Sequence, residues 1–268
     1  MKYIKSLYRL KPIHLCIAGF IIKIVCLNNK VVNNIKNTNS NIKVAYKNFV
    51  LSSTPEKIDF QIDLLNQANT RFLRQGDSNF LFFYKKTGSR RITACSQLTW
   101  IHFSVLLRVI LSELLKSNGF LLHASASKIG SQAVIFLGKS GTGKSTITQL
   151  LKPKWKILAD DSVIIKKENN KYYLYQNPFI ENNTYLKSSE KYPINSIMFL
   201  KQADKCSLKK VTISSQTSKL FLMQLYSEKQ YISEDLKVAL DFLHKFNQFH
   251  FLKFSKNYPE LEKIFSKK

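Results

Sequence analysis

The residues with the most specific chemistry lie between Gly138 and Ser162, where the sequence reads GKSGTGKSTITQLLKPKWKILADDS. Gly138, Gly143, Lys144 and Ser145 fill the pattern G-x-x-x-x-G-K-[S/T]. In this pattern the glycines adopt backbone angles that other residues avoid, so that several N–H groups converge on one phosphate. The lysine reaches the outer phosphates of a nucleotide, and the hydroxyl is a ligand for Mg²⁺. The sequence therefore predicts a phosphate-binding loop.

The residues on either side of this loop support the prediction. The apolar run AVIFL, at 133–137, is typical of a buried strand, and STITQLL, at 145–151, has the pattern of a short helix that stops before Pro153. A helix that begins near Lys144 would direct its positive end at the phosphate. We therefore expect ATP as the cofactor, bound by Gly138, Lys139, Ser140, Gly141, Thr142, Gly143, Lys144, Ser145 and Thr146.

Two adjacent carboxylates, Asp160 and Asp161, follow the run WKIL at 155–158, which we expect to form a strand next to the loop strand. Such neighbours repel each other unless a cation lies close, and nucleotide-bound Mg²⁺ would supply it. Because side chains alternate along a strand, the two carboxylates point in different directions. We expect Asp160 to accept a proton from a substrate hydroxyl and Asp161, with Ser145, to hold Mg²⁺, although the two aspartates could be exchanged. A turn or helix cap at 160–162 is the alternative without catalysis.

Three segments together resemble a known family: LLHASAS at 121–127, AVIFLGKSGTGKST at 133–146 and LADD at 158–161. They are similar to the catalytic domain of HPr kinase/phosphorylase and of a larger group of HPr-kinase-related bacterial proteins. The resemblance implies the P-loop fold shared with ATP-dependent phosphoenolpyruvate carboxykinase. The histidine that this family carries ahead of its loop falls on His123, which would assist by binding an aspartate or the phosphate. A buried strand histidine is the alternative.

The resemblance implies an ATP- and Mg²⁺-dependent kinase that transfers the γ-phosphoryl group to a hydroxyl of a protein, a peptide or a small molecule. The segments YQNPF at 175–179 and 192–221 are more similar to the related proteins than to HPr kinases themselves, whose arginine-bearing loop is not recognisable here. No arginine follows Arg108. Charge on the transferring group would be neutralised by Lys144 and Mg²⁺, or by arginines of a neighbouring subunit or of the N-terminal part, namely Arg71, Arg74, Arg90 and Arg91. The family often forms rings, so a homo-oligomer is a further expectation.

Three other functions compete with the kinase. A non-catalytic ATP-binding subunit of a modification or biosynthesis system would keep the loop and lose the transfer. A carboxykinase-like lyase would need further basic and metal-binding residues ahead of the loop. The net charge of +25 would suit a nucleic-acid-binding protein. That charge is spread along the whole chain, and the many Lys, Asn and Ile residues fit an A/T-rich genome, so no specific nucleic-acid partner is expected.

The whole chain of 268 residues predicts an α/β protein with three parts. Residues 1–95 read as a small β-rich N-terminal domain, with a loop at 28–48. Residues 96–118 read as a connecting helix, and 119–268 as the HPr-kinase-like P-loop domain, with a hairpin turn at Asn169-Asn170 and covering helices from about residue 217 to 254. The apolar stretch at 13–27 is too short for a membrane span and contains Lys23, so we expect strands broken near Gly19. With four widely spaced cysteines, a cytoplasmic protein is expected.

Overall fold

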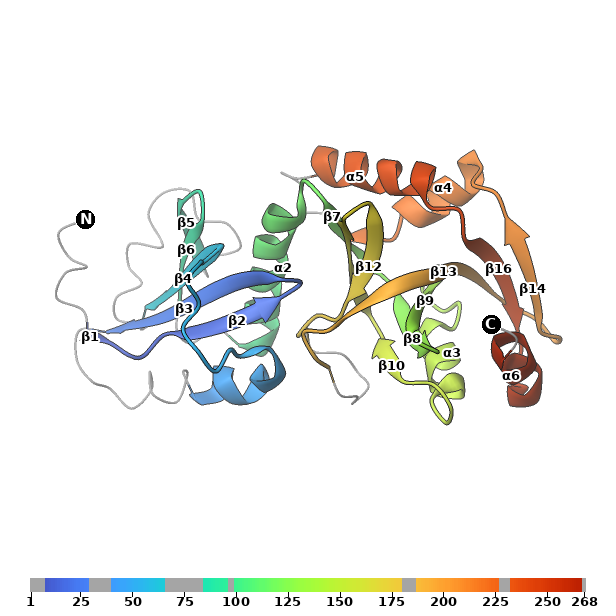
Figure 1. Ribbon diagram of the computed structural model, residues 1–268, viewed down its shortest axis with the longest axis horizontal. Coiled ribbons are helices and arrows are strands. Elements are labelled where there is room, and N and C mark those ends of the chain that lie inside the picture. Colours follow the sequence, from blue (N-terminus) through green and yellow to red (C-terminus); the bar gives the residue numbers. More distant parts are fainter. Residues whose placement is uncertain are drawn as a thin grey trace. The chain divides into compact units, whose positions relative to one another are not determined.

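The computed structural model describes residues 8–28, 40–65, 84–95, 99–179, 187–226 and 232–266. These residues form a mixed α/β chain with two β-sheets (Figure 1). The chain divides into two compact units, Met1–Ile110 and Leu111–Lys268. The division falls within helix α2 (Trp100–Leu115), which occupies most of the predicted connecting helix. The domain limits at residues 95 and 119 therefore stay predictions.

The first unit contains a six-stranded sheet in which the strands follow the order β1-β3-β4-β6-β5, and β2 pairs with β3. The strands are β1 (Tyr8–Arg9), β2 (Ile13–Ile17), β3 (Phe20–Asn28), β4 (Phe60–Leu65), β5 (Tyr84–Gly88) and β6 (Arg91–Cys95). Strands β2 and β3 form a hairpin whose turn contains Ala18 and Gly19 at φ values of 52° and 79°. The prediction of strands broken near Gly19 is confirmed.

One expectation for this unit is wrong. Within the loop predicted at 28–48, residues 40–45 are helical and are followed by a 3₁₀ helix, η2 (Lys47–Phe49), whereas 29–39 lie outside the described residues. Ile42 and Tyr46 are both only 2% exposed. Their spacing of four places them on the same side of a helix, so burying them together favours helix over loop.

The second unit contains a ten-stranded sheet with the order β10-β8-β9-β13-β12-β11-β7-β15. In addition, β16 pairs with β13, and β14 pairs with β16. The strands are β7 (Gly119–His123), β8 (Ser125–Ile129), β9 (Gln132–Leu137), β10 (Ile157–Ala159), β11 (Ser162–Glu168), β12 (Lys171–Tyr175), β13 (Lys191–Gln202), β14 (Ser207–Val211), β15 (Leu225–Tyr226) and β16 (Phe249–Phe254). The helices are α3 (Lys144–Leu151), α4 (Ser215–Leu222), α5 (Ile232–Lys245) and α6 (Tyr258–Ser266).

Two layers of helices cover the two faces of this sheet, and alternate side chains of the loop strand β9 pack against each layer. Its residues Ile135 and Leu137 belong to a core that includes Phe221 of α4 and Phe242 of α5. Its residues Val134 and Phe136 belong to a second core, with side chains of α3 and α6. Figure 1 shows α4 and α5 on one side of the sheet and α3 and α6 on the other. A strand buried on both faces needs a continuous apolar run, which AVIFL provides.

The sequence predicts that the strand before the aspartate pair lies next to the loop strand. The structure shows that it does not. Strand β10 pairs with β8, and β8 pairs with β9, so β8 lies between the two. The short connection from β8 to β9 forms a hairpin that fills the position beside the loop strand. Helix α3 therefore crosses over β8 before the chain returns as β10.

The C-terminal part differs from the run of covering helices expected from residue 217. Helix α4 ends at Leu222, and α5 ends at Lys245. Residues 249–254 form β16, which lies parallel to β13, because Phe249, Leu252 and Phe254 are buried in a central position of the sheet. The hairpin between β11 and β12 turns at Asn169 and Asn170, as predicted. Among the described residues, no helix is both long and apolar enough to cross a bilayer.

Candidate functional site

The predicted phosphate loop joins the end of β9 to the first turn of α3. Gly141 and Gly143 have φ values of +80° and +97°, which L side chains rarely adopt. Thr142 donates both its N–H and its hydroxyl to the carbonyl of Lys139, at 3.2 and 2.8 Å. A β-carbon at Gly138 would lie 2.4 Å from the Thr142 hydroxyl oxygen. The compact turn therefore requires glycine at these three positions.

Lys144 lies at the base of this loop and is only 7% exposed. Its ammonium donates to the carbonyl of Gly138 at 2.8 Å and to that of Lys139 at 3.4 Å. Burial lowers the pKa of this ammonium below the usual 10.5, and the Asp161 carboxylate partly opposes that shift. Ser145, in the first turn of α3, is exposed.

Asp161, His123 and Tyr226 form a cluster at the ends of three paired strands. The Nδ1 atom of His123 lies 3.2 Å from Oδ1 of Asp161. The hydroxyl of Tyr226 lies 3.3 Å from the same Nδ1 and donates to Oδ2 of Asp161 at 3.4 Å. The imidazole and phenol rings meet edge to face at 5.8 Å. Together these contacts fix the orientation of the imidazole and of the carboxylate.

Backbone pairing explains why this cluster forms. His123 is the register partner of Ser162, and its N–H donates to the carbonyl of Gln224. Tyr226, on β15, is paired with the neighbouring strand β7. Two residues after His123, the buried hydroxyl of Ser125 donates to the carbonyl of Lys144 at 2.8 Å. The strand that carries His123 and the strand that follows it therefore reach both the acid pair and the phosphate loop.

The two aspartates have different surroundings. The Asp160 residue is 4% exposed, whereas the Asp161 side chain is 39% exposed. The chain segment that holds them is fixed on both sides by two buried amides. Gln176 donates to the carbonyl of Leu158 at 2.8 Å, and Asn177 donates to the carbonyl of Ser162 at 2.6 Å.

Sequence reasoning missed several of these residues. Gln176 and Asn177 belong to the YQNPF segment, which carries part of the family resemblance but no predicted role. Tyr226 had no sequence signal, because a two-residue strand has no periodicity and its contacts come from strand pairing. Ser125 is part of the LLHASAS segment, but nothing in its type predicts a contact with the helix that follows the loop.

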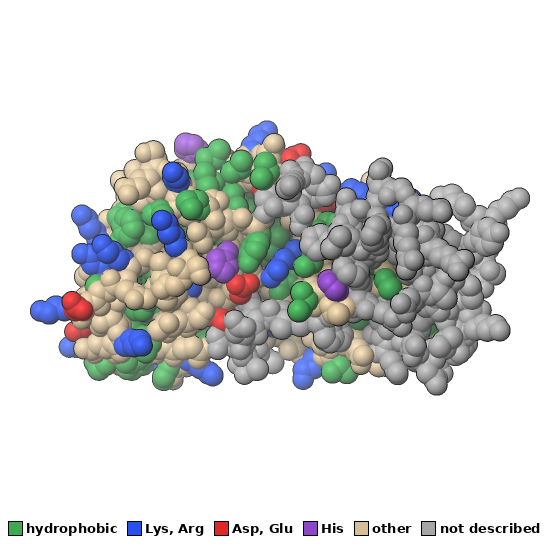
Figure 2. Space-filling model, turned by 180° about the vertical axis from the view of Figure 1, so that it is seen from behind, with side chains coloured by type: hydrophobic (Ala, Val, Ile, Leu, Met, Phe, Trp, Pro, Cys, Tyr) green, Lys and Arg blue, Asp and Glu red, His purple; other side chains and the backbone are tan. Residues whose placement is uncertain are grey.

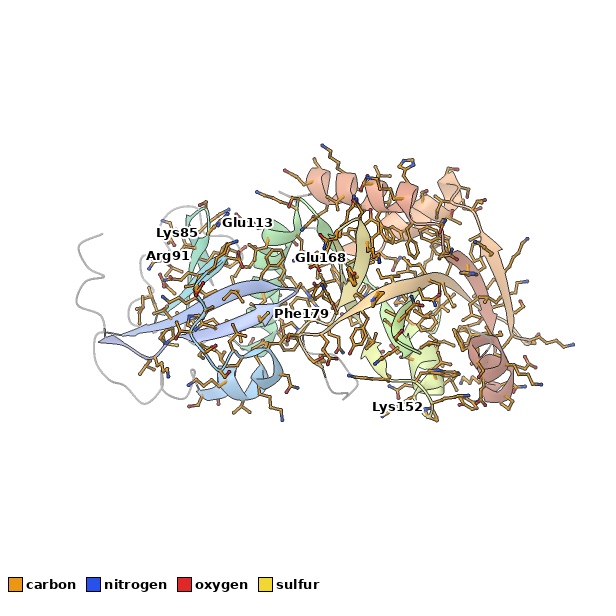
Figure 3. The ribbon with its side chains drawn as sticks, viewed as in Figure 1. Lys85, Arg91, Glu113, Lys152, Glu168 and Phe179 are labelled. Atoms are coloured by element: carbon orange, nitrogen blue, oxygen red, sulfur yellow. The ribbon has the colours of Figure 1, made fainter. Side chains whose placement is uncertain are left out.

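The structure describes only some of the arginines that could neutralise charge on the transferring phosphate. Arg71 and Arg74 lie outside the described residues. Arg91, labelled in Figure 3, pairs through its guanidinium with Asp63, which is 2% exposed. This ion pair partly neutralises Arg91, whereas Arg90 is exposed. On the face drawn in Figure 2, Lys and Arg side chains are spread over the described surface rather than gathered in one patch.

A magnesium ion would find only part of its ligands in the protein. In the part of the chain that the structure describes, no group of three or more His, Cys, Asp or Glu side chains could hold a metal ion. Mg²⁺ commonly binds one or two carboxylates and takes its other ligands from water and nucleotide phosphates. The exposed hydroxyl of Ser145 and the half-exposed carboxylate of Asp161 are donors of the type this requires.

Comparisons with known proteins place the chain in a family. The model of the SynChlorMet cassette protein ScmC family matches residues 91–237, which is more than half of the chain. Among solved structures, the Hpr(Ser) kinase/phosphatase from Coxiella burnetii is similar over 47% of this chain and 97% of that chain, with 13% identity and a TM-score of 0.27. No curated protein matches the chain. The family model thus names a group other than the HPr kinases of the sequence resemblance. The chain belongs to the SynChlorMet cassette protein ScmC family.

Proposed function

We propose that the protein is an ATP-dependent phosphotransferase that moves the γ-phosphoryl group of ATP to a hydroxyl group. The observation that carries this proposal is the position of Asp161. Its carboxylate lies 3.2 Å from Nδ1 of His123, and its negative charge partly opposes the lowering by burial of the pKa of Lys144 in the glycine loop. A carboxylate, an imidazole and a loop lysine within one unit are the groups that phosphoryl transfer uses for positioning and charge compensation.

Each group has a proposed role. The backbone N–H groups of 139–145 and the first turn of α3 bind the β-phosphate, and Lys144 neutralises charge on the outer oxygens. Ser145 and Asp161 hold Mg²⁺, which would neutralise the phosphate charge that develops during transfer. A carboxylate has about four lone-pair positions, so Asp161 can bind a metal and still accept from Tyr226.

The proton acceptor is proposed to be Asp160, with His123 as the group that assists. Asp160 is 4% exposed and the Asp161 side chain is half-exposed. The alternative is that Asp161 accepts the proton and Asp160 holds Mg²⁺. Asp160→Asn separates them: if Asp160 is the base, nucleotide binding stays and transfer is lost. If Mg²⁺-dependent nucleotide binding is lost instead, Asp160 is a metal ligand.

The proposal is tested by transfer of label from γ-labelled ATP to hydroxyl-bearing peptides, proteins and small molecules. Lys144→Ala should lower the rate by about 100-fold or more, because a charged donor to the transferring group is removed. The circular dichroism spectrum should stay unchanged. A folded Lys144→Ala variant with normal turnover would contradict the assignment.

A second function is favoured by one observation. The family description names a cassette protein, which suits a subunit that binds ATP within a biosynthetic system and transfers nothing. The wild-type protein distinguishes the two functions directly. Nucleotide binding that depends on Lys144, without labelled product from any acceptor, would favour this second function.

A further inference from the structure

We propose that Gln176 and Asn177 are positioning residues that set the place of the aspartate pair relative to the phosphate loop. They are 1% and 2% exposed, and they reach the chain on opposite sides of the pair. Gln176 holds the carbonyl of Leu158, two residues before Asp160. Asn177 holds both the carbonyl and the hydroxyl of Ser162, directly after Asp161, at 2.6 and 3.1 Å. This role rests on the proposed function of the same site.

Both amides are fixed at their other ends as well. The carbonyl oxygen of Gln176 accepts from the N–H and the hydroxyl of Ser188, at 3.2 and 3.1 Å. The carbonyl oxygen of Asn177 accepts at 3.0 Å from the N–H of Phe179, a residue that is 1% exposed and is labelled in Figure 3. Each amide thus connects the acid pair to the chain that follows β12.

The partners determine which end of each amide is nitrogen. A backbone carbonyl only accepts and a backbone N–H only donates, so Leu158 and Ser162 require the NH₂ ends, and Ser188 and Phe179 require the oxygen ends. A carboxylate has the shape of an amide but no donor. Gln176→Glu and Asn177→Asp would therefore keep one contact and place an oxygen against a carbonyl oxygen at the other.

The topology of the sheet explains why the aspartate pair needs positioning contacts. The aspartates lie between β10, which pairs with β8, and β11, which pairs with β7 and β12. Neither aspartate lies inside a strand. The carbonyl of Asp161 accepts from the N–H of Ala124 at 3.1 Å, and the two amides add contacts before and after the pair. A catalytic group displaced by about 1 Å can cost about 100-fold in rate.

The experiment compares Asn177→Asp and Gln176→Glu with a matched control, Asn195→Asp. Asn195 is half-buried and donates its NH₂ group at 2.8 Å to the side chain of Gln132, so its variant makes the same amide-to-carboxylate change away from the aspartates. Three quantities are measured: ATP affinity with a chelator, the gain in affinity on adding Mg²⁺, and kcat for transfer. We expect both site variants to lose about 10-fold or more in kcat and most of the Mg²⁺ gain, while metal-free affinity changes less than about twofold. The control should change none of them.

The outcomes separate positioning from a structural role. If the site variants melt at lower temperature but keep the kcat and the Mg²⁺ gain of the control, the inference is wrong. If Asn177→Asp does not fold, Asn177→Ser replaces it, because the serine hydroxyl is a donor too short to span the same distance, and the same losses are expected. If the wild-type protein binds ATP with Mg²⁺ but transfers nothing, the proposed function fails. The Mg²⁺ gain of the variants then decides the inference alone.

Discussion

Replacing Gly143 with alanine should destabilise the unit that holds the phosphate loop, for two separable reasons. The residue has φ = +97°, and a side chain held in such a conformation costs about 1–3 kcal/mol. Its added β-carbon would also lie 2.6 Å from Cζ of Phe254, whose residue is 3% exposed and so has little room to move. Overpacking of this kind costs about 1–3 kcal/mol, so we expect a total loss of about 4 kcal/mol.

Gly141→Ala is the matched control for the first reason. Gly141 has φ = +80°, and no atom lies within 4 Å of the β-carbon position. It should therefore show backbone strain without the clash. Phe254→Leu combined with Gly143→Ala tests the second reason, because a smaller side chain makes room for the β-carbon. The double-mutant cycle should show a favourable coupling of about 1–3 kcal/mol.

The free energy of unfolding can be followed in urea by the fluorescence of Trp155 in a Trp100→Phe background. Trp155 packs edge to face on Phe265 at 5.9 Å within the core beneath α3, so its emission reports on the unit that carries the loop. Two results would refute the reasoning. One is an equal loss for Gly143→Ala and Gly141→Ala. The other is a double variant in which Phe254→Leu gives no relief.

Three further predictions concern the core and the loop lysine. Phe242→Ala should lower the free energy of unfolding by about 3–5 kcal/mol, because the ring is fully buried and meets Phe120 and Phe221 at 5.5 and 5.6 Å. Phe246 is half-buried, so Phe246→Ala should lower the free energy of unfolding by less than half as much in the same urea assay. Equal losses for the two variants would contradict the assigned core. ATP affinity should fall as pH rises through the lowered pKa of Lys144, because the folded protein loses this charge below the usual 10.5. Titration with a fluorescent ATP analogue from neutral pH to about pH 10 checks this, and Lys144→Met should remove that part of the pH dependence. The same shift should raise stability over that window, since the unfolded chain then binds more protons.

Local features of the sequence predicted the strand, the glycine turn and the short helix between residues 132 and 151. The order of apolar run, glycine turn and short helix depends on contacts between residues close in the chain, and β9, the turn and α3 follow it. Positive φ values at Gly141 and Gly143 are a property of residue type, because glycine lacks a β-carbon. The same holds for the hairpin turn at Asn169 and Asn170.

Predictions failed where neighbours in space were decisive. The periodicity from about residue 217 to 254 suggested covering helices throughout, but Phe249, Leu252 and Phe254 are buried beside β13, and that packing selects a strand. The strand of the aspartate pair was expected beside β9, whereas the β8–β9 hairpin occupies that position. The propensity of a segment does not specify its partner strand, which depends on the whole sheet.

The sequence predicts which groups could take part in chemistry: the loop with Lys144 and Ser145, the acid pair and His123. Its glycines and its apolar runs also determined the backbone that carries the loop. The fold selects Asp161 as the partner of His123, adds Tyr226 to the pair and places two buried amides on the chain around the aspartates. Strand pairing brings together residues that are about a hundred positions apart in the chain. No local sequence pattern encodes such a contact, because it forms when the whole sheet is buried.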